Sequence, residues 1–182
     1  MFETNNLRIR AVRNTDFEKI HDLWNDLRVQ KSLSPSYVVP LGNKFEETLR
    51  TWAADALLYC IIETKDKSDW VGFVNLFNAD RKNRDAMLGL ALCPEFWGRG
   101  YATEVLRFVV DYAFRELALH RIALNVFGNN AAAIKVYKRV GFVEEGIQRK
   151  ANWSGGKWQD VVLMAILDEE WSASRENMVN ET

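Results

Sequence analysis

The chain has 182 residues, 48% of them hydrophobic and 12% aromatic, which is enough to bury one sizeable core. Lys and Arg number 24 against 25 for Asp and Glu, and this near-neutral balance argues against a dedicated binder of nucleic acid or of anionic membranes. No run approaches the roughly 18 apolar residues of a membrane span, and the amino end has no basic segment followed by an apolar one. We therefore expect a cytoplasmic protein with one main domain, residues 1–170, and a polar carboxyl-terminal tail, residues 171–182.

The first third of the chain predicts a strand and two helices. Residues 7–11 alternate apolar and basic side chains, as in a short strand. A capping box at residues 15–18 and apolar residues at helical spacing over residues 17–27 predict a helix directly after it. A loop rich in Ser and Pro, residues 31–43, separates this helix from a second one with an apolar stripe over residues 45–53.

The middle of the chain predicts a meander followed by a long helix. Residues 56–63, 70–77 and 86–92 read as strands, and short polar stretches separate them, so we expect antiparallel neighbours. The long helix begins near Ala102. Cys60 lies within one of these apolar runs and Cys93 beside another, which favours reduced thiols over a disulfide or a metal site.

The last third predicts two more strands around a short helix. Residues 121–127 read as a strand and residues 131–140 as a helix, with Gly141 where a left-handed cap belongs. The chain then re-enters the sheet and turns back at a hairpin, "WSGGK", into a final strand over residues 161–167. The tail after it is polar and is expected to fray, with Trp171 anchoring its start.

Two glycines stand directly before the long helix. Gly98 and Gly100 let the backbone turn tightly and bring several N–H groups to one point at a helix start, where the helix dipole also favours an anion. Arg99 adds a positive charge, so we interpret this turn as a site for a phosphate ester; a purely geometric role for the glycines is the alternative. No P-loop motif is present, and Thr103 stands where a dinucleotide fingerprint needs glycine.

At these residues the sequence resembles the GNAT superfamily of acetyl-CoA-dependent N-acetyltransferases. Trp97-x-x-Gly100-x-Ala102 matches the superfamily's pyrophosphate loop except for Trp in the first position, where Gln or Arg is usual. "PEFWGRGYATE" and "NVFGNNAAAIKVYKRVGFVEEG" look like the branch that contains ribosomal-protein N-terminal acetyltransferases and spermidine acetyltransferases. The resemblance implies an α/β (α+β) fold, a mixed and mostly antiparallel sheet with splayed central strands flanked by helices.

The resemblance also implies where acetyl-CoA, the cosubstrate, would bind. The loop amides would hold the CoA pyrophosphate, one strand would lie beside the pantetheine arm, and Asn130 would contact the cofactor; its alternative role is a helix N-cap. The expected cofactor-binding residues are Leu90, Ala91, Leu92, Trp97, Gly98, Arg99, Gly100, Tyr101, Ala102, Thr103 and Asn130.

Tyr137 and Asn125 are the candidate catalytic residues. The family places a tyrosine at the position of Tyr137 to donate a proton to the departing CoA thiolate; without the resemblance, Tyr137 reads as a core residue on one helical face. Many relatives carry a carboxylate on the strands where Met87 and Asn125 stand here, and neither residue can act as a base. The base is therefore unassigned.

Several groups could help the acceptor lose its proton or bind. A water chain, a less basic amine, or one of Glu46, Glu47 and Asp55 could replace the missing base, although such acids are usually solvated surface charges. Asp160 is the most plausible cation-facing residue of the carboxyl-terminal hairpin.

The leading hypothesis is therefore an enzyme that transfers acetyl from acetyl-CoA to a primary amine in a ternary complex. The acceptor is a small amine, such as a polyamine, or a protein N-terminus. The alternative is a non-catalytic acyl-CoA binding or sensing module, suggested by the missing strand carboxylates. No nucleic acid or membrane partner is expected, and a homo-oligomer is left open.

Overall fold

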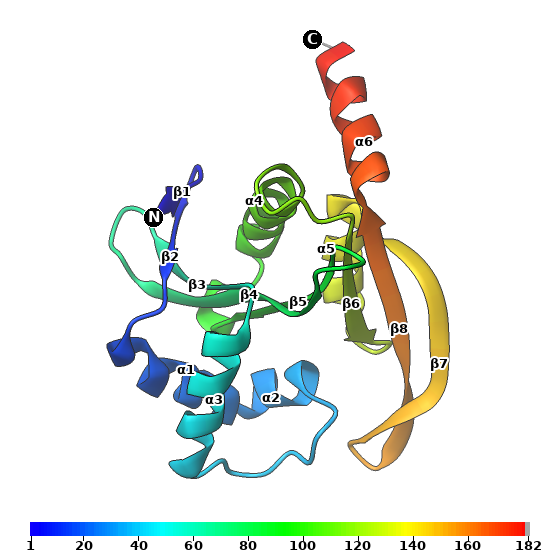
Figure 1. The fold of residues 1–182 in the computed structure, drawn as a ribbon. Helices are drawn as coiled ribbons and strands as arrows, with labels where there is room; N and C mark the ends of the chain where they lie inside the picture. Colours follow the sequence, from blue (N-terminus) through cyan, green and yellow to red (C-terminus); the bar gives the residue numbers. More distant parts are fainter. Residues whose placement is uncertain (181–182) are drawn as a thin grey trace. The chain divides into compact units, whose positions relative to one another are not determined.

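The computed structural model describes residues 1–180 (Figure 1). Its strands are β1 (Phe2–Glu3), β2 (Leu7–Ala11), β3 (Leu58–Thr64), β4 (Trp70–Asp80), β5 (Asp85–Leu92), β6 (Arg121–Phe127), β7 (Val143–Ser154) and β8 (Lys157–Leu167). Its helices are α1 (Phe17–Asn25), α2 (Leu27–Leu33), α3 (Lys44–Asp55), α4 (Tyr101–Arg115), α5 (Ala131–Val140) and α6 (Asp168–Asn180), with short 3-10 turns at Asn14–Asp16 and Pro94–Phe96. Among the described residues, no helix combines the length and the apolar character needed to cross a membrane.

The strands follow the hydrogen-bonded order β1-β2-β3-β4-β5-β6-β8-β7. β5 and β6 run parallel, while β1–β2, β2–β3, β3–β4, β6–β8 and β7–β8 are antiparallel. The register of β5 with β6 covers only three residue pairs, from Asp85 with Arg121 to Met87 with Ala123. This short register agrees with the expected mixed sheet whose central strands splay.

The chain forms two compact units. The first contains Met1–Asn78 and Leu88–Val105, and the second contains Ala79–Met87 and the chain from Leu106 onward. In the first unit, α1, α2 and α3 lie on one side of β3 and β4 (Figure 1). Their apolar faces explain this, because Ile20 and Leu49 are almost fully buried in one cluster with Ile61 of β3 and Phe73 of β4.

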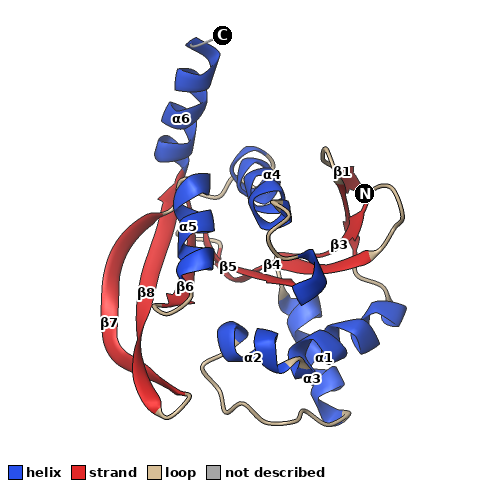
Figure 2. Cartoon of the chain, turned by 180° about the vertical axis from the view of Figure 1, so that it is seen from behind, coloured by secondary structure: helices blue, strands red, loops and turns tan. Residues whose placement is uncertain are grey.

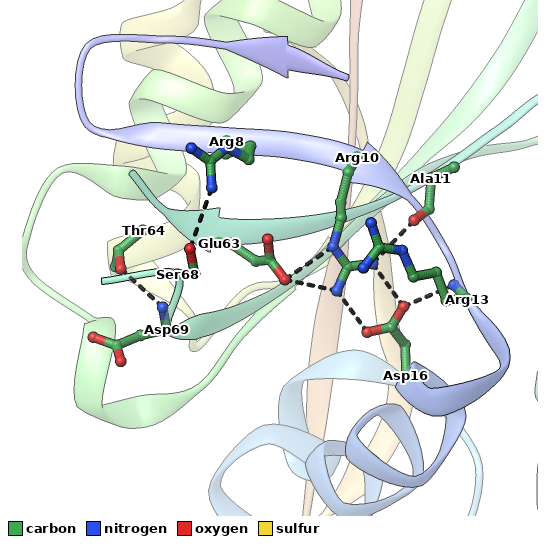
Figure 3. A network of polar contacts seen from close by, with 9 residues as sticks. All are labelled: Arg8, Arg10, Ala11, Arg13, Asp16, Glu63, Thr64, Ser68 and Asp69. Carbon is green, nitrogen blue, oxygen red and sulfur yellow. Dashed lines mark hydrogen bonds and ion pairs between the residues drawn. The ribbon is translucent and has the colours of Figure 1, made fainter. Parts of the chain in front are cut away.

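A buried ion-pair network ties the start of α1 to the first strands. Arg10 of β2 donates to both carboxylate oxygens of Asp16, at 2.7 and 2.8 Å, and to Glu63 of β3, at 2.7 and 2.9 Å (Figure 3). Asp16 also accepts a hydrogen bond from the backbone N–H of Arg13 at 2.7 Å. Asp16 is only 3% exposed. Burial opposes its ionisation, yet the hydrogen bonds from Arg10 and Arg13 outweigh burial and lower its pKa.

The expected capping box at residues 15–18 was wrong. The carboxylate of Asp16 accepts a hydrogen bond from the backbone N–H of Arg13, three residues earlier, in place of the two reciprocal hydrogen bonds expected between Thr15 and Glu18. The helix predicted over residues 17–27 also ends early, because Asp26 has an extended backbone (ψ 115°). The Asp26 side chain instead caps α2 by accepting from the N–H of Arg28 at 2.9 Å.

In the second unit, β8 pairs with β6 over Arg121–Phe127 on one side and with β7 on the other. α5 lies beside β6 and β8 (Figure 2). It ends at Val140, and the left-handed backbone of the following Gly141 (φ 116°) confirms the expected cap. A Cβ at Gly141 would lie 3.1 Å from Cδ1 of Ile166 in β8, so glycine also permits close packing there.

β7 is the edge strand of this unit, and its pairing with β8 is irregular. The register shifts between Glu144 and Gly146 and again between Gln148 and Asn152, where Lys150 has a positive φ of 52°. At each shift β7 has more residues than β8, as at a β-bulge, and the extra residues lie outside the ladder.

The tail expected to fray is helical as far as Asn180, the last described residue; residues 181 and 182 lie outside the described part. Trp171 contacts Phe114 of α4 with ring centroids 5.6 Å apart, which supports its expected anchoring role. Arg175 lies over the same indole and pairs with Asp111. The boundary near residue 170 stays a prediction.

Candidate functional site

The turn before α4 has the geometry of an anion cradle. Gly98 and Gly100 both adopt the left-handed conformation, with φ of 74° and 83°, and a Cβ added at either glycine would meet no atom within 4 Å. α4 begins at Tyr101, and the first hydrogen bond across its start runs from the N–H of Glu104 to the carbonyl of Gly100. No turn or loop hydrogen bond of the described residues uses the N–H groups from Gly98 to Thr103, so these donors have no backbone partner.

Arg99 adds a positive charge to this turn. Its guanidinium lies 5.3 Å from the ring centroid of Phe96, and the Phe96 ring in turn lies 6.2 Å from that of Tyr101. Arg99 itself is exposed, whereas Phe96 is buried. The buried Phe96 ring therefore packs against the side chain of Arg99, which pairs with no carboxylate among the side chains that the structure describes.

Trp97 departs from the expected loop in residue type, and the structure shows what its indole does. Nε1 donates to the carbonyl oxygen of Leu92 at 2.8 Å, while 49% of the residue stays exposed. An indole has one N–H, so Trp97 has no second side-chain donor for a phosphate. Of the segment expected beside the pantetheine arm, Leu90 is half-buried and Ala91 and Leu92 are buried.

The start of α4 is also fixed to the amino-terminal strands. Glu104, in the first turn, accepts hydrogen bonds from the hydroxyl of Thr4 at 2.5 Å and from the backbone and side-chain nitrogens of Asn6 at 2.7 and 2.9 Å. Burial opposes ionisation of Glu104, but these hydrogen bonds outweigh it and lower the pKa. The first helical turn therefore cannot shift freely relative to β1 and β2.

Asn130 directly precedes α5 and Tyr137 lies on it, and both belong to the second unit. The side chain of Asn130 accepts from the N–H of Ala133 at 3.1 Å, which confirms its role as an N-cap; the cofactor contact stays a prediction. Tyr137 is half-buried against Phe142, with ring centroids 5.8 Å apart. Burial raises the pKa of Tyr137 to about 12, so its phenol keeps its proton at neutral pH and remains a donor.

The positions that lack a carboxylate lie on β5 and β6. Asn125 is exposed on β6 and pairs in register with Leu163 of β8. Met87 is half-buried on β5 opposite Ala123. No charged group stands at either position, so the structure supplies no base there.

The acids considered as substitutes have varied surroundings. Glu46 accepts a hydrogen bond from Nη2 of Arg50 at 2.6 Å and lines a polar cavity of about 550 Å³, whereas Glu47 and Asp55 are exposed on α3. Asp160, the expected cation-facing residue, is exposed and accepts a hydrogen bond from the backbone N–H of Lys150 on β7, at 2.8 Å. The other residues lining the cavity are Asn14, Thr15, Glu18, His21, Asp22 and Asn43.

The predicted site residues thus fall into two groups. The first unit brings together the strand segment from Leu90 to Leu92 and the loop from Trp97 to Thr103, joined by the indole hydrogen bond to Leu92. Asn125, Asn130 and Tyr137 belong to the second unit. The first group can bind an anionic group at exposed amides, and the second carries a protonated phenol.

One feature beside this strand segment was not predicted. The side chain of Asn75 on β4 lies over Gly89 on β5, directly before Leu90. The signal in the sequence was a polar residue inside one apolar run, "WVGFVNLF", and a glycine inside another, "AMLGLAL".

Comparison with known proteins places this geometry in a family context. Residues 6–143 match the model of the acetyltransferase (GNAT) domain family. The spermidine N(1)-acetyltransferase of Vibrio cholerae is 29% identical over 167 residues, which covers 91% of this chain and 95% of that protein. A crystal structure of the Vibrio cholerae spermidine N-acetyltransferase in complex with CoA and spermine superposes with a TM-score of 0.83 at 28% identity, covering 92% of this chain and 99% of that one.

A second kind of relative matches over a shorter stretch. The putative ribosomal N-acetyltransferase YdaF of Bacillus subtilis is 36% identical over 104 residues. This match covers 57% of this chain and 57% of that protein, just over half the length of each.

Proposed function

Since this chain belongs to the GNAT family and is an acetyl-CoA-dependent N-acetyltransferase, we propose that its acceptor is a primary amine of a polyamine, acetylated by direct attack in a ternary complex. The observation that carries the cofactor half of the proposal is the open turn at Gly98 and Gly100, with unused backbone donors and Arg99 beside them. The similarity to spermidine acetyltransferases spans nearly the whole chain and supports the acceptor half.

We assign the residues as follows. The amides from Gly98 to Thr103 hold the CoA diphosphate, and the segment from Leu90 to Leu92 lies beside the pantetheine arm. The amine nitrogen attacks the thioester carbonyl carbon, and the tetrahedral intermediate collapses by breaking the C–S bond. Tyr137 donates its phenolic proton to the departing thiolate, and the proton that the attacking nitrogen loses on forming the amide restores the phenol. The raised pKa of Tyr137 keeps the phenol protonated between turnovers.

The acceptor must lose a proton before it attacks, and this requirement separates two classes of acceptor. An alkylammonium with a pKa near 10.4 costs about 4.6 kcal/mol to deprotonate at pH 7, whereas an α-amino group with a pKa near 7.8 costs about 1 kcal/mol. Because neither Met87 nor Asn125 can act as a base, a protein N-terminal amine is the second candidate acceptor. The partial similarity to the ribosomal N-acetyltransferase favours this candidate too.

The proposal extends to location and assembly. We place the reaction in the cytoplasm, and the free thiols of Cys60 and Cys93 are compatible with a reducing compartment. We also expect a homo-oligomer, because a related spermidine N-acetyltransferase of Vibrio cholerae forms a dodecamer. Size-exclusion chromatography with light scattering tests the assembly.

An acceptor screen tests the function. Purified protein is mixed with acetyl-CoA and either spermidine, spermine, simple monoamines or short peptides with free N-termini, and free thiol is measured. Release that depends on spermidine or spermine supports the proposal, and release with peptides alone selects the second candidate. Binding of acetyl-CoA without release for any acceptor would instead identify a non-catalytic binding module and refute the proposed activity.

A further inference from the structure

Asn75 occupies an unusual place on the sheet of the first unit. It lies on β4 two residues after Phe73, so the two side chains share the face that α1 and α3 cover, and Phe73 belongs to the core cluster there. Its partner on β3 is Tyr59, which packs against the same cluster. Asn75 is half-buried, at the border of this apolar region.

The neighbouring strand is adapted to this side chain. β4 and β5 are adjacent in the sheet (Figure 1), and an added Cβ at Gly89 would lie only 2.3 Å from Oδ1 of Asn75. Any other residue at this position would displace the amide. A glycine inside a strand weakens it, and such a glycine often marks a close approach by another group.

The oxygen that Gly89 accommodates has no partner. Oδ1 of Asn75 is buried and makes no hydrogen bond within residues 1–180. A buried unpaired carbonyl destabilises a fold, and a native structure that keeps one needs a reason. Two features that lower the stability of the fold, the strand glycine and the unpaired oxygen, therefore lie at the same place on the sheet.

That spot lies beside the segment assigned to the thioester arm. Gly89 directly precedes Leu90, and Ala91, two residues further, faces the same side of β5 as Gly89. A group bound at Asn75 is therefore next to the start of this segment, on the face covered by α1 and α3.

We propose that Asn75 orients the acceptor amine: its Oδ1 accepts a hydrogen bond from one of the N–H groups of the amine. This inference rests on the proposed acetyltransferase function. The terminal torsion of asparagine is broad, so the oxygen can turn from Gly89 toward the exposed side of the residue when a donor arrives. The chemistry suits an amide better than a carboxylate. A carboxylate would stabilise the ammonium form, which cannot attack, whereas a neutral carbonyl orients the free amine without holding its proton.

The test measures steady-state kinetics with acetyl-CoA and spermidine for the wild type and three variants. Asn75→Leu removes the oxygen at similar size, and Gly89→Ala keeps the asparagine but displaces its amide. We expect both variants to raise KM for spermidine about tenfold, the loss of one hydrogen bond to the acceptor, and to change KM for acetyl-CoA by less than about twofold. Gly146→Ala on β7 is the control, because a Cβ there meets no atom within 4 Å.

Thermal unfolding separates this role from a structural one. Because Asn75→Leu removes an unpaired polar atom, its unfolding temperature should equal or exceed that of the wild type while its acceptor KM rises. An unchanged spermidine KM in both variants, or equal rises in both KM values, overturns the inference. If Asn75→Leu does not fold, Gly89→Ala alone decides. If the wild type releases no thiol with any amine, the proposed function fails first, and the role of Asn75 falls with it.

Discussion

Replacing Asp16 by Asn tests whether the ion-pair network of Figure 3 holds the first unit together. The substitution keeps the size of the side chain and removes its charge. Arg10, only 8% exposed, would then lose the carboxylate that it contacts at 2.7 and 2.8 Å. Arg10 would keep Glu63, which limits the loss.

The expected cost follows from burial. Removing one partner of a buried ion pair typically costs about 3–5 kcal/mol. Because Glu63 remains and Asn can still accept one hydrogen bond from the N–H of Arg13, we expect the lower end, about 3 kcal/mol. For a chain of this size, that lowers the unfolding temperature by roughly 6–12 °C.

Equilibrium urea unfolding, followed by circular dichroism, measures the free energy of unfolding of both proteins. The control is Asp26→Asn, which removes an exposed ion pair with Arg28 and keeps an asparagine able to cap α2, so it should cost less than about 1 kcal/mol. A loss below about 1 kcal/mol for Asp16→Asn would refute the view that this buried network stabilises the fold.

The difference in folding stability between the wild type and Asp16→Asn should also depend on pH. The folded pKa of Asp16 lies below the ordinary value of 3.8, so its contribution is fully present above that value and is lost as pH falls toward the folded pKa. The stability difference between wild type and Asp16→Asn should therefore be constant near neutral pH and shrink below about pH 4. A difference that grows on acidification would contradict this sign.

Three further substitutions address the site. Tyr137→Phe should lower kcat about a hundredfold or more while the Kd for acetyl-CoA stays unchanged, and an unaltered kcat would leave Tyr137 a packing residue. Gly100→Asp should raise the Kd for acetyl-CoA at least tenfold by like-charge repulsion, whereas Gly155→Asp, at another left-handed glycine with open space, should not; equal effects would remove the diphosphate assignment. Trp97→Phe removes the indole hydrogen bond to the carbonyl of Leu92 and should raise the Kd for acetyl-CoA, measured by calorimetry, about threefold to tenfold. A Kd equal to that of the wild type would show that this hydrogen bond is dispensable.

Much of the fold could be predicted because local patterns and tertiary structure agree. β2, β6 and α5 have the predicted bounds, since their periodicity and, for α5, its glycine cap are unambiguous. The break at Asp26 was not predictable from the apolar spacing, which continues through it, because a backbone cap and not periodicity ends α1. α6 was missed because its residues show no apolar face, and its start is held by the contact of Trp171 with Phe114, which is distant in sequence.

The candidate site also contains some features that the sequence could predict and others that it could not. The turn at Gly98 and Gly100 could be predicted because left-handed glycines before a helix leave a sequence signature. The hydrogen bond from Trp97 to Leu92 could not, since an indole donor chooses its acceptor only once the chain has folded. The contact of Asn75 with Gly89 joins residues on different strands, and a single sequence does not reveal such a pair.

The irregular outer strand β7 also affects how the molecule meets its own copies. Regular edge strands expose a row of peptide groups on which another chain can add as a template, which is the first step toward fibres. The two register shifts and the left-handed Lys150 interrupt that row, so an incoming strand finds no continuous ladder. The exposed side of β7 is therefore a poor nucleus for aggregation, and copies of this chain that meet at this edge would have to associate by packing side chains instead of by extending the sheet.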